Sequence, residues 1–256
     1  MLSWGTKRKL LITLAVCAIG VLILVWYIAT AFYRAPTCSD GRQNGNETGV
    51  DCGGSCAKVC LNQALPTIVH WQRAFLVSRG RYNAVAYVEN PNLHSGAKDA
   101  PYVFKLYDGD SILVAERAGS TVIPPHGVVA VFEANIYTGD RPPARVEFSF
   151  DTPPVWVALS AAPPELSVSG QNIIDVQTTP LIQAHISNNG KQRLGSFPLV
   201  AIVYDENNNA RAVSQTVSDP LSPNSSLPVI FSWPSPFDFV PARIEIIPKV
   251  YPGVNY

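Results

Sequence analysis

The longest apolar run of the chain extends from Leu10 to Phe32 and contains no charged residue, no proline and one glycine. At a rise of ~1.5 Å per residue, a helix of about 23 residues is ~34 Å long, enough to cross a hydrocarbon core of ~30 Å. The run therefore predicts a transmembrane helix at residues 10–32. Aromatic side chains, which favour the headgroup layer, gather at its far end: Trp26, Tyr27, Phe32 and Tyr33.

Basic residues flank this helix unequally. Lys7-Arg8-Lys9 precedes it, whereas only Arg34 follows it before a long polar region. Because basic residues concentrate on the cytoplasmic side, residues 1–9 are predicted to be a cytoplasmic tail, and the rest of a single-pass cell-membrane protein to lie outside. A cleaved signal peptide is the alternative, since Ala29-Thr30-Ala31 resembles a cleavage site, but the run exceeds the ~7–15 apolar residues of a signal peptide.

Beyond the helix, apolar residues recur with the spacing of short strands. Ile68–Val77 is a first apolar run, and then Tyr82, Ala84, Ala86 and Val88 alternate with polar or smaller residues, as on one face of a half-buried strand. Further strands are expected at Tyr102–Tyr107, Ile112–Ala115, Val128–Ile136 and Arg145–Phe150. The 22 prolines and the turn residues between these runs predict an all-β fold with a first β-sandwich at residues 64–150.

The residues Phe104-Lys-Leu-Tyr-Asp108 match the motif of the FxLYD family, and residues 66–150 resemble these small exported domains. A strand ending in Asn90 before the motif, and a proline-glycine break with a long apolar strand after it, fit the same resemblance. It implies an immunoglobulin-like β-sandwich. In its central strand Phe104 and Leu106 share one face, Tyr107 points to the other, and an Asp-Gly turn follows.

The second half of the chain repeats this plan. Tyr107-Asp108 corresponds to Tyr204-Asp205 at an offset of 97 residues, and Ala144–Glu147 corresponds to Ala242–Glu245 at an offset of 98. Three more pairs share the offset of 98: Pro66 with Pro164, Ala86 with Ala184, and Asn90 with Asn188. Anchors with nearly one offset indicate a duplication, and hence tandem immunoglobulin-like β-sandwiches.

The second sandwich is expected at residues 164–256. Its motif has diverged to Ala201-Ile-Val-Tyr-Asp205, in which the phenylalanine is lost. Residues 151–163 form the junction, and their apolar middle, Val155–Leu159, lies between two proline pairs. This pattern predicts a stiff hinge that packs on a sandwich or extends a strand.

A short cysteine-rich module is predicted at residues 35–60, between the helix and the first sandwich. It contains the cysteines outside the apolar run: Cys38, Cys52, Cys56 and Cys60. In an oxidising compartment they are expected to form two disulfides, for which three connectivities exist, while structural zinc is the less favoured alternative. The segment resembles DCGGxC-type cysteine-rich segments of exported bacterial proteins, a resemblance that implies no activity.

Oxygen-bearing side chains lie between the first two of these cysteines, interleaved with glycines. They are Asp40, Asn44, Asn46, Glu47 and Asp51. Calcium accepts such a set of oxygen ligands, so these residues are a candidate calcium site. The favoured alternative is that Asp, Asn and Gly form turns in a solvated loop, with no cofactor bound.

Charge and motifs exclude several function classes. Of the 19 basic residues, four lie in residues 1–34, where there is no acidic residue, so the exported part has 15 basic against 19 acidic residues and a net charge of −4. This gives no electrostatic footprint for nucleic acid. The four histidines, His70, His94, His126 and His185, show no metal-ligand spacing, and no nucleophile motif is found. The sequence therefore predicts a protein that is not an enzyme.

One segment, Phe231–Phe239, alternates aromatic residues with prolines. Trp233, Phe237 and Phe239 are candidates for a binding surface, although the favoured alternative is that they plug the end of the second sandwich. The function expected is protein or glycan binding, or a structural role in an envelope complex. The alternative is an accessory or sensor subunit of an exported enzyme or of a transport or secretion assembly.

Overall fold

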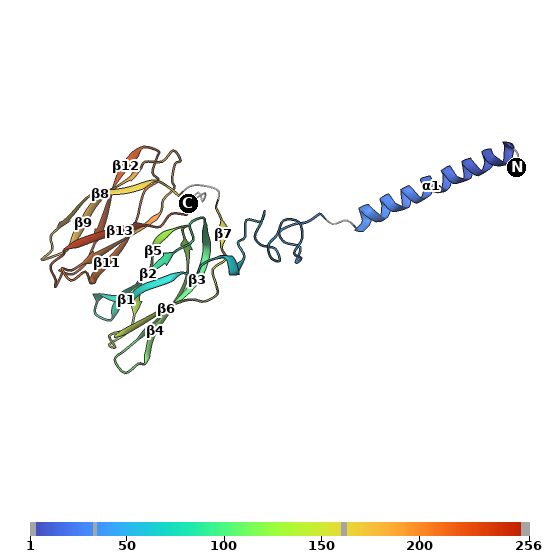
Figure 1. The fold of residues 1–256 in the computed structure, drawn as a ribbon. Coiled ribbons are helices and arrows are strands. Elements are labelled where there is room, and N and C mark those ends of the chain that lie inside the picture. The colour runs from blue at the N-terminus through green and yellow to red at the C-terminus, as the bar shows by residue number, and fades with distance from the viewer. Residues whose placement is uncertain (1–3, 33–34, 160–162, 252–256) are drawn as a thin grey trace. The chain divides into compact units, whose positions relative to one another are not determined.

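The computed structural model describes residues 4–32, 35–159 and 163–251, in two compact units, Met1–Asp51 and Cys52–Tyr256. In the first unit the apolar run forms a helix, α1 (Trp4–Phe32), that begins six residues before the predicted span and includes the basic tripeptide (Figure 1). It is long and apolar enough to cross a membrane. Such a helix indicates secretion or membrane anchoring. Tyr33 and Arg34, which the orientation argument used, lie outside the described residues.

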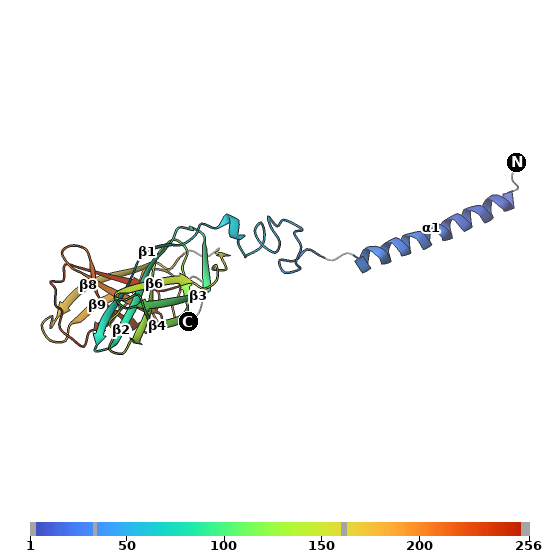
Figure 2. The same ribbon diagram turned by 90° about the horizontal axis from the view of Figure 1, so that it is seen from below.

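The second unit is built of short antiparallel strands, as the spacing of apolar residues predicted. The first half contains a 3₁₀ turn, Leu61–Gln63, and the strands β1 (Ile68–Ser78), β2 (Arg81–Asn90), β3 (Ser95–Tyr107), β4 (Leu113–Ile123), β5 (Gly127–Tyr137), β6 (Arg145–Phe150) and β7 (Val157–Ala158). The second half contains β8 (Leu166–Ile174), β9 (Leu181–Asn188), β10 (Pro198–Tyr204), β11 (Ala210–Val217), β12 (Ser225–Ser232) and β13 (Arg243–Pro248). The two halves are coloured cyan to yellow-green and yellow to red (Figure 2).

The strands pair into four sheets, two in each half. In the first half the orders are β1-β2-β5 and β4-β3-β6, and in the second they are β8-β9-β12 and β11-β10-β13. If β8 is matched with β1, and so on along the chain, the two halves have the same pairing pattern. The predicted all-β sandwich fold is thereby confirmed. That the halves arose by duplication stays a prediction.

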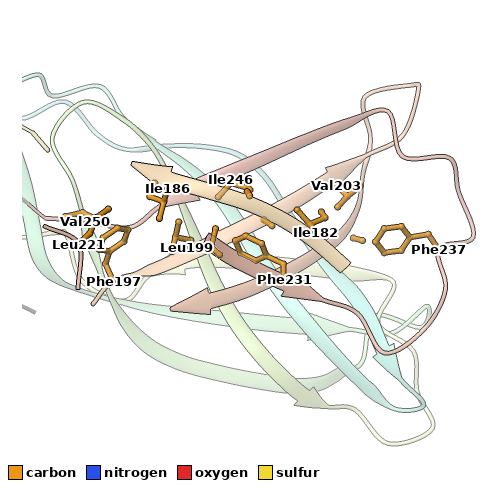
Figure 3. Close-up of a cluster of buried hydrophobic side chains, with 14 residues drawn as sticks. Ile182, Ile186, Phe197, Leu199, Val203, Leu221, Phe231, Phe237, Ile246 and Val250 are labelled. Atoms are coloured by element: carbon orange, nitrogen blue, oxygen red, sulfur yellow. The ribbon is translucent and has the colours of Figure 1, made fainter. Parts of the chain in front are cut away.

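Each half encloses an apolar core between its two sheets. In the first core the motif residues Phe104 and Leu106 are fully buried, and the Phe104 ring lies 5.0 Å from that of Phe148. In the second core, shown in Figure 3, Phe197 and Phe231 are buried together with Ala201. Ala201 stands where the first half has Phe104, so these two rings occupy the volume that the lost phenylalanine would otherwise have filled.

A third apolar cluster, here called the shared core, joins the two sandwiches. It contains Phe75, Val85, Ala130, Val200, Ile202, Tyr204, Ala210, Val213 and Ile247. Its members come from β1, β2 and β5 of the first half and from β10, β11 and β13 of the second. Strands β2 and β10 are thus buried on both faces, since alternate side chains enter a sandwich core and the shared core. The sequence pattern predicted only one buried face for β2.

A polar contact crosses the same interface. Both Tyr87 of β2 and Tyr204 of β10 donate a hydrogen bond to the carboxylate of Glu245, at 2.7 Å and 2.9 Å. Burial, together with this carboxylate, raises the pKa of Tyr204 to about 12 and that of Tyr87 further. The tyrosines therefore remain neutral donors, and the partly buried carboxylate is hydrogen-bonded from both sandwiches.

The junction packs on the first sandwich. Trp156 is buried in the first core, and β7 pairs with Ser95 and Gly96 at the start of β3. The apolar middle of the junction therefore packs on the first sandwich, one of the two outcomes expected for it, and also pairs as a short strand with β3. Residues 160–162 of the junction lie outside the described residues.

A buried asparagine closes the same loop in each half. The Asn90 side-chain amide donates to the carbonyls of Ser95 (2.9 Å) and Pro124 (2.7 Å), and its Oδ1 accepts from the backbone N–H of Asn92 (3.0 Å). At the equivalent position, the Asn188 amide donates to Gln192 and Leu221, and its Oδ1 accepts from Gly190. These asparagines end β2 and β9 and satisfy backbone groups that the sheets leave unpaired.

Replacing Asn90 by alanine is expected to lower the free energy of unfolding by about 2–4 kcal/mol, because two carbonyls and one N–H lose their partner inside the protein. Urea denaturation of the full chain in detergent micelles measures this loss. The exposed Asn189, whose amide donates only to the Ser167 hydroxyl, is the matched control, and its alanine variant should stay within about 0.5 kcal/mol of wild type. Equal losses in the two variants would contradict the assigned role of Asn90.

Candidate functional site: a groove between the sandwiches

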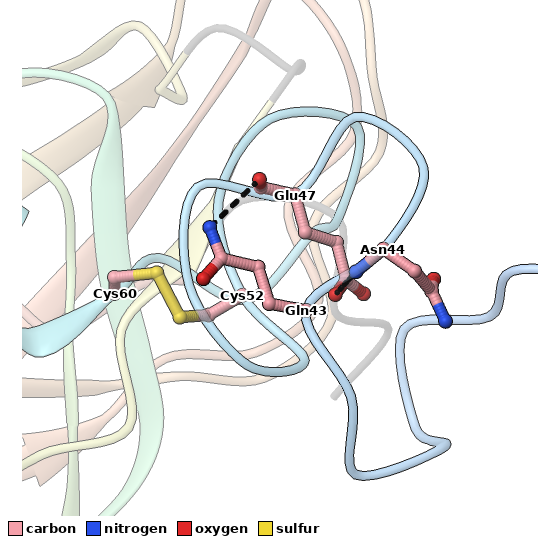
Figure 4. The surroundings of a disulfide bond; sticks show 5 residues. All are labelled: Gln43, Asn44, Glu47, Cys52 and Cys60. Atoms are coloured by element: carbon pink, nitrogen blue, oxygen red, sulfur yellow. Dashed lines mark hydrogen bonds between the residues drawn. A yellow bond between two sulfur atoms is a disulfide. The ribbon is translucent and has the colours of Figure 1, made fainter.

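The cysteine module is oxidised. Cys52 and Cys60 form a disulfide with a Cα–Cα distance of 5.0 Å (Figure 4), and Cys38 and Cys56 are disulfide-bonded as well. Cys17, in α1, is a free thiol. The expected disulfides are thus confirmed. Because thiolates bind zinc and disulfide sulfurs do not, the zinc alternative is not supported.

Peptide mapping under non-reducing conditions should recover Cys52 and Cys60 in one cross-linked pair and Cys17 as a free, alkylated thiol. Recovery of Cys52 joined to any other cysteine would contradict the observed pairing. Four alkylated thiols in the module, or bound zinc, would contradict its oxidised state.

The candidate calcium ligands bond mainly to their own loop. Both Asp51 carboxylate oxygens accept from the Gly41 N–H, and Glu47 Oε2 accepts from the Asn44 N–H at 3.2 Å (Figure 4). Asp40 accepts from the Asn44 amide at 2.8 Å, and this bond lowers the Asp40 pKa. Among the described residues, Asn44 Oδ1 is buried without a hydrogen-bond partner, while Asn46 is exposed. One such oxygen is far short of the about six to eight that calcium requires, so the turn interpretation is favoured and calcium stays a prediction.

The aromatic and proline segment plugs the end of the second sandwich and also faces solvent. Phe237 is buried in the second core, and Trp233 and Phe239 are half-buried against it. The Phe237 ring lies 5.2 Å from that of Trp233 and 4.9 Å from that of Phe239. The three rings therefore fill the sandwich end, as the plug interpretation expected, while Trp233 and Phe239 stay partly exposed, and a binding surface there stays a prediction.

These two partly exposed rings line a groove of about 500 Å³ between the two sandwiches. One wall is the segment Ser232–Phe239, and the opposite wall is Phe75–Arg79, at the end of β1. Residues Arg211–Val213 of β11 and Asn83 of β2 complete the lining. The volume lies within the range of about 300–1,000 Å³ that is typical of ligand sites. Because the shared core holds the two sandwiches together, the walls of the groove are fixed by packing.

Side chains cap the edge of β11 at this groove. Trp233 Nε1 donates to the carbonyl of Val213 at 3.1 Å, and Arg73 Nη1 donates to the carbonyl of Ala210 at 3.3 Å. Strand edges expose unpaired backbone groups that recruit other strands, and caps of this kind prevent it. The indole N–H of Trp233 is thus used within the protein.

Charges at the groove are nearly balanced. Arg211 lies 3.2 Å from Asp238 and 3.6 Å from Asp205, and its guanidinium stands 5.2 Å from the centre of the Phe239 ring. Arg79 pairs with Asp140 at 3.1 Å, but 92% and 86% of their side-chain surfaces are exposed. A pair this exposed contributes little to stability, so Arg79 can exchange its partner at small cost.

Carboxylates close to one another in the sequence lie in turns. Asp108 Oδ1 accepts backbone bonds from Asp110 and Ile112, and Asp205 Oδ1 accepts from Asn207 and Asn209 in the equivalent loop. These backbone hydrogen bonds hold the pKa of each aspartate below its usual value. The largest effect on Asp108 comes from the Ile112 N–H, and the largest effect on Asp205 comes from the Asn209 N–H. Both residues remain ionised at neutral pH and act as turn formers.

The four histidines lie on separate elements: His70 in β1, His94 before β3, His126 before β5 and His185 in β9. His70 Nε2 lies 2.7 Å from Glu89 Oε2, a partly exposed cross-strand pair. The structure therefore brings together the two aromatic candidates Trp233 and Phe239 with groove residues that the sequence did not single out, above all Leu76, Arg79 and Arg211. No local pattern marks these three, because the groove forms only when strands more than a hundred residues apart meet.

Similarity to known proteins is found among solved structures and not among family models or curated sequences. No family model matches the chain, and no curated protein matches it. Among solved structures, the crystal structure of red sea bream transglutaminase is similar over 71% of this chain and 31% of that chain, with 12% sequence identity and a TM-score of 0.23. A likeness this distant supports no argument about function. The resemblance to FxLYD domains stays a prediction.

Proposed function

We propose that the chain is a single-pass membrane-anchored protein whose extracytoplasmic part binds a partner protein without catalysing a reaction. The apolar helix α1 and the disulfides of the cysteine module support export, with the helix as the anchor. The observation that carries binding is the groove between the sandwiches, whose walls are rigid and whose lining mixes aromatic, aliphatic and charged groups.

A protein is favoured over a glycan as the partner because the aromatic groups are already engaged. Trp233 donates its indole N–H to Val213 and forms a T-shaped contact with Phe237, and Phe239 stacks on Phe237 with the Arg211 guanidinium over its own ring. Sugars are typically bound by open aromatic faces. In this groove the rings of Trp233 and Phe239 contact Phe237, Arg211 lies over Phe239, and aliphatic side chains such as Leu76 complete the apolar lining.

We infer further that both halves are FxLYD-type immunoglobulin-like domains. Each part of the motif has a physical role in the first half: Phe104 and Leu106 fill the core, and Asp108 forms the turn. Arg145 stands 4.1 Å from the centre of the Tyr107 ring, and in the second half Arg243 stands 3.6 Å from that of Tyr204. The arginine of each Ala-Arg-x-Glu segment also pairs with the glutamate two residues on, so the same contacts support the inference in both halves.

The absence of catalysis is part of the proposal. It is supported by the dispersal of the histidines and by the turn roles of the aspartates. The His70–Glu89 pair lies at the surface of neighbouring strands, and His70 is not among the residues that line the groove. An acid–base group must reach its substrate within hydrogen-bond distance, which a group outside the site cannot do.

A reporter that works only outside the cytoplasm, fused after residue 256, tests the topology. It is expected to be active, and the protein should stay with membranes at its uncleaved mass. Release of a shorter protein that begins near residue 32 would show that the helix is a cleaved signal.

Crosslinking tests the binding function. With the protein in its native membrane, a crosslinker attached at position 76 is expected to trap a partner protein. Position 230 is the control, and equal trapping at the two positions would contradict a role for the groove.

A further inference from the structure

One backbone edge at the groove has no cap. Strand β1 pairs along one side with β2, and across residues 4–32, 35–159 and 163–251 it pairs with no other strand. Its pairing with β2 is regular from Trp71 to Leu76. The last residues of this strand, Phe75–Ser78, and Arg79 after it line the groove, opposite the β11 edge that Trp233 and Arg73 cap.

This edge has only part of the usual protection. Edge strands are commonly kept short, bulged, or supplied with proline or lysine, which prevent another strand from adding. β1 has 11 residues and contains neither proline nor lysine, and its register with β2 shifts between Val69 and Trp71 and between Leu76 and Ser78. The Leu76 side chain is 67% exposed beside the groove. An added strand requires a free edge, which the regular stretch before the second shift supplies, and the exposed leucine offers it an apolar contact.

The side chains around this edge define what such a strand would carry. Alternate residues of a strand point to opposite sides, so one side of the added strand would lie over Leu76 and the other along Trp233 and Phe239. Both surfaces suit aliphatic or aromatic side chains. The most exposed charge at the rim is the guanidinium of Arg79, whose surface pair with Asp140 is weak. A carboxylate of the added strand can replace Asp140 there.

We propose that the groove binds an extended, apolar and acidic peptide segment of the partner protein, which adds as a strand to the free edge of β1. The proposal rests on the proposed binding function and specifies its chemistry. Backbone hydrogen bonds to β1 supply affinity, and the pockets beside Leu76 and the aromatic wall supply specificity. Because the walls are fixed by the shared core, little ordering cost is paid by this protein on binding.

The test uses the full chain in nanodiscs and a phage-displayed library of random linear peptides as the probe. Selected peptides are expected to combine apolar residues with an acidic residue. Hydrogen–deuterium exchange with a selected synthetic peptide should show slowed exchange of the β1 amides around Phe75 and Leu76. Protection of another strand, or no enrichment of any peptide, would overturn the proposal.

Two variants complete the test. Leu76→Asp is expected to weaken binding of the synthetic peptide at least about tenfold, because it places a carboxylate where the apolar acidic segment lies. Ile230→Asp is the matched control, since Ile230 is 52% exposed on β12 and does not line the groove, and it should leave affinity unchanged. Unchanged affinity in Leu76→Asp, with both variants folded by thermal melting, would overturn the proposal. If crosslinking still trapped a partner protein, the proposed binding function would be kept, and only the addition of a strand to β1 would be rejected.

Discussion

Replacing Phe104 by alanine is expected to lower the free energy of unfolding by about 3–5 kcal/mol. Phe104 is fully buried in the first core and contacts the rings of Phe148 and Tyr102, at centroid distances of 5.0 Å and 5.7 Å. Alanine removes the ring from these contacts and leaves a cavity between two sheets that cannot collapse fully. Denaturant unfolding of the full chain in detergent micelles, followed by near-UV circular dichroism, measures the change.

Ile112→Ala is the control for Phe104→Ala. Ile112 lies in the turn after the same motif but is 48% exposed, so its truncation should change the free energy of unfolding by no more than about 0.5 kcal/mol. If Phe104→Ala were as mild as its control, the motif strand would not be the centre of the first core.

Ile202→Ala is expected to destabilise both sandwiches, by about 2–5 kcal/mol. Ile202 is fully buried in the shared core, together with Val85 of the first sandwich. The cavity that alanine leaves in the shared core weakens the packing between the two sandwiches, whereas the first and second cores keep their own contacts. Native-state hydrogen exchange measures the effect on each sandwich. The amides of β2 in the first sandwich and those of β10 in the second should both exchange faster than in the wild type.

The next residue along β10 supplies the comparison. Val203 is also fully buried, but it belongs to the second core, which contains residues of the second sandwich alone. Val203→Ala should therefore speed exchange in β9, β10 and β12 and leave β2 unchanged. If Ile202→Ala also left β2 unchanged, the two sandwiches would be independently stable and the shared core would not couple them.

Much of the fold could be predicted from local pattern. The apolar run of residues 10–32 has the length of a membrane span, and the helix α1 covers it. Period-two alternation and turn residues located β1 to β6 of the first half, although β4 continues to Ile123, beyond the expected Ile112–Ala115. The position of the lost phenylalanine, Ala201, could also be read from the sequence, and the second core holds it together with Phe197 and Phe231.

The aromatic segment could be predicted only in part. Its composition suggested a surface or a plug, and the two interpretations could not be separated because burial depends on what lies opposite. The structure shows Phe237 inward and Trp233 with its N–H on a neighbouring strand edge. Which cysteine pairs with Cys52 was likewise open, since spacing allows several loops and the chain path selects Cys60.

Local residue order was therefore enough for the apolar helix, the oxidised cysteine module, the strands and the two similar halves, because hydrophobic period, turn chemistry and cysteine count all act over a few residues. The second buried face of β2 and β10, the shared core and the groove required the tertiary structure. Each depends on side chains such as Val85 and Ile202, or Leu76 and Trp233, that are more than a hundred residues apart and meet only when two finished sheets pack face to face. An exposed strand face and an interface face have the same alternation, so only the packing partner distinguishes them.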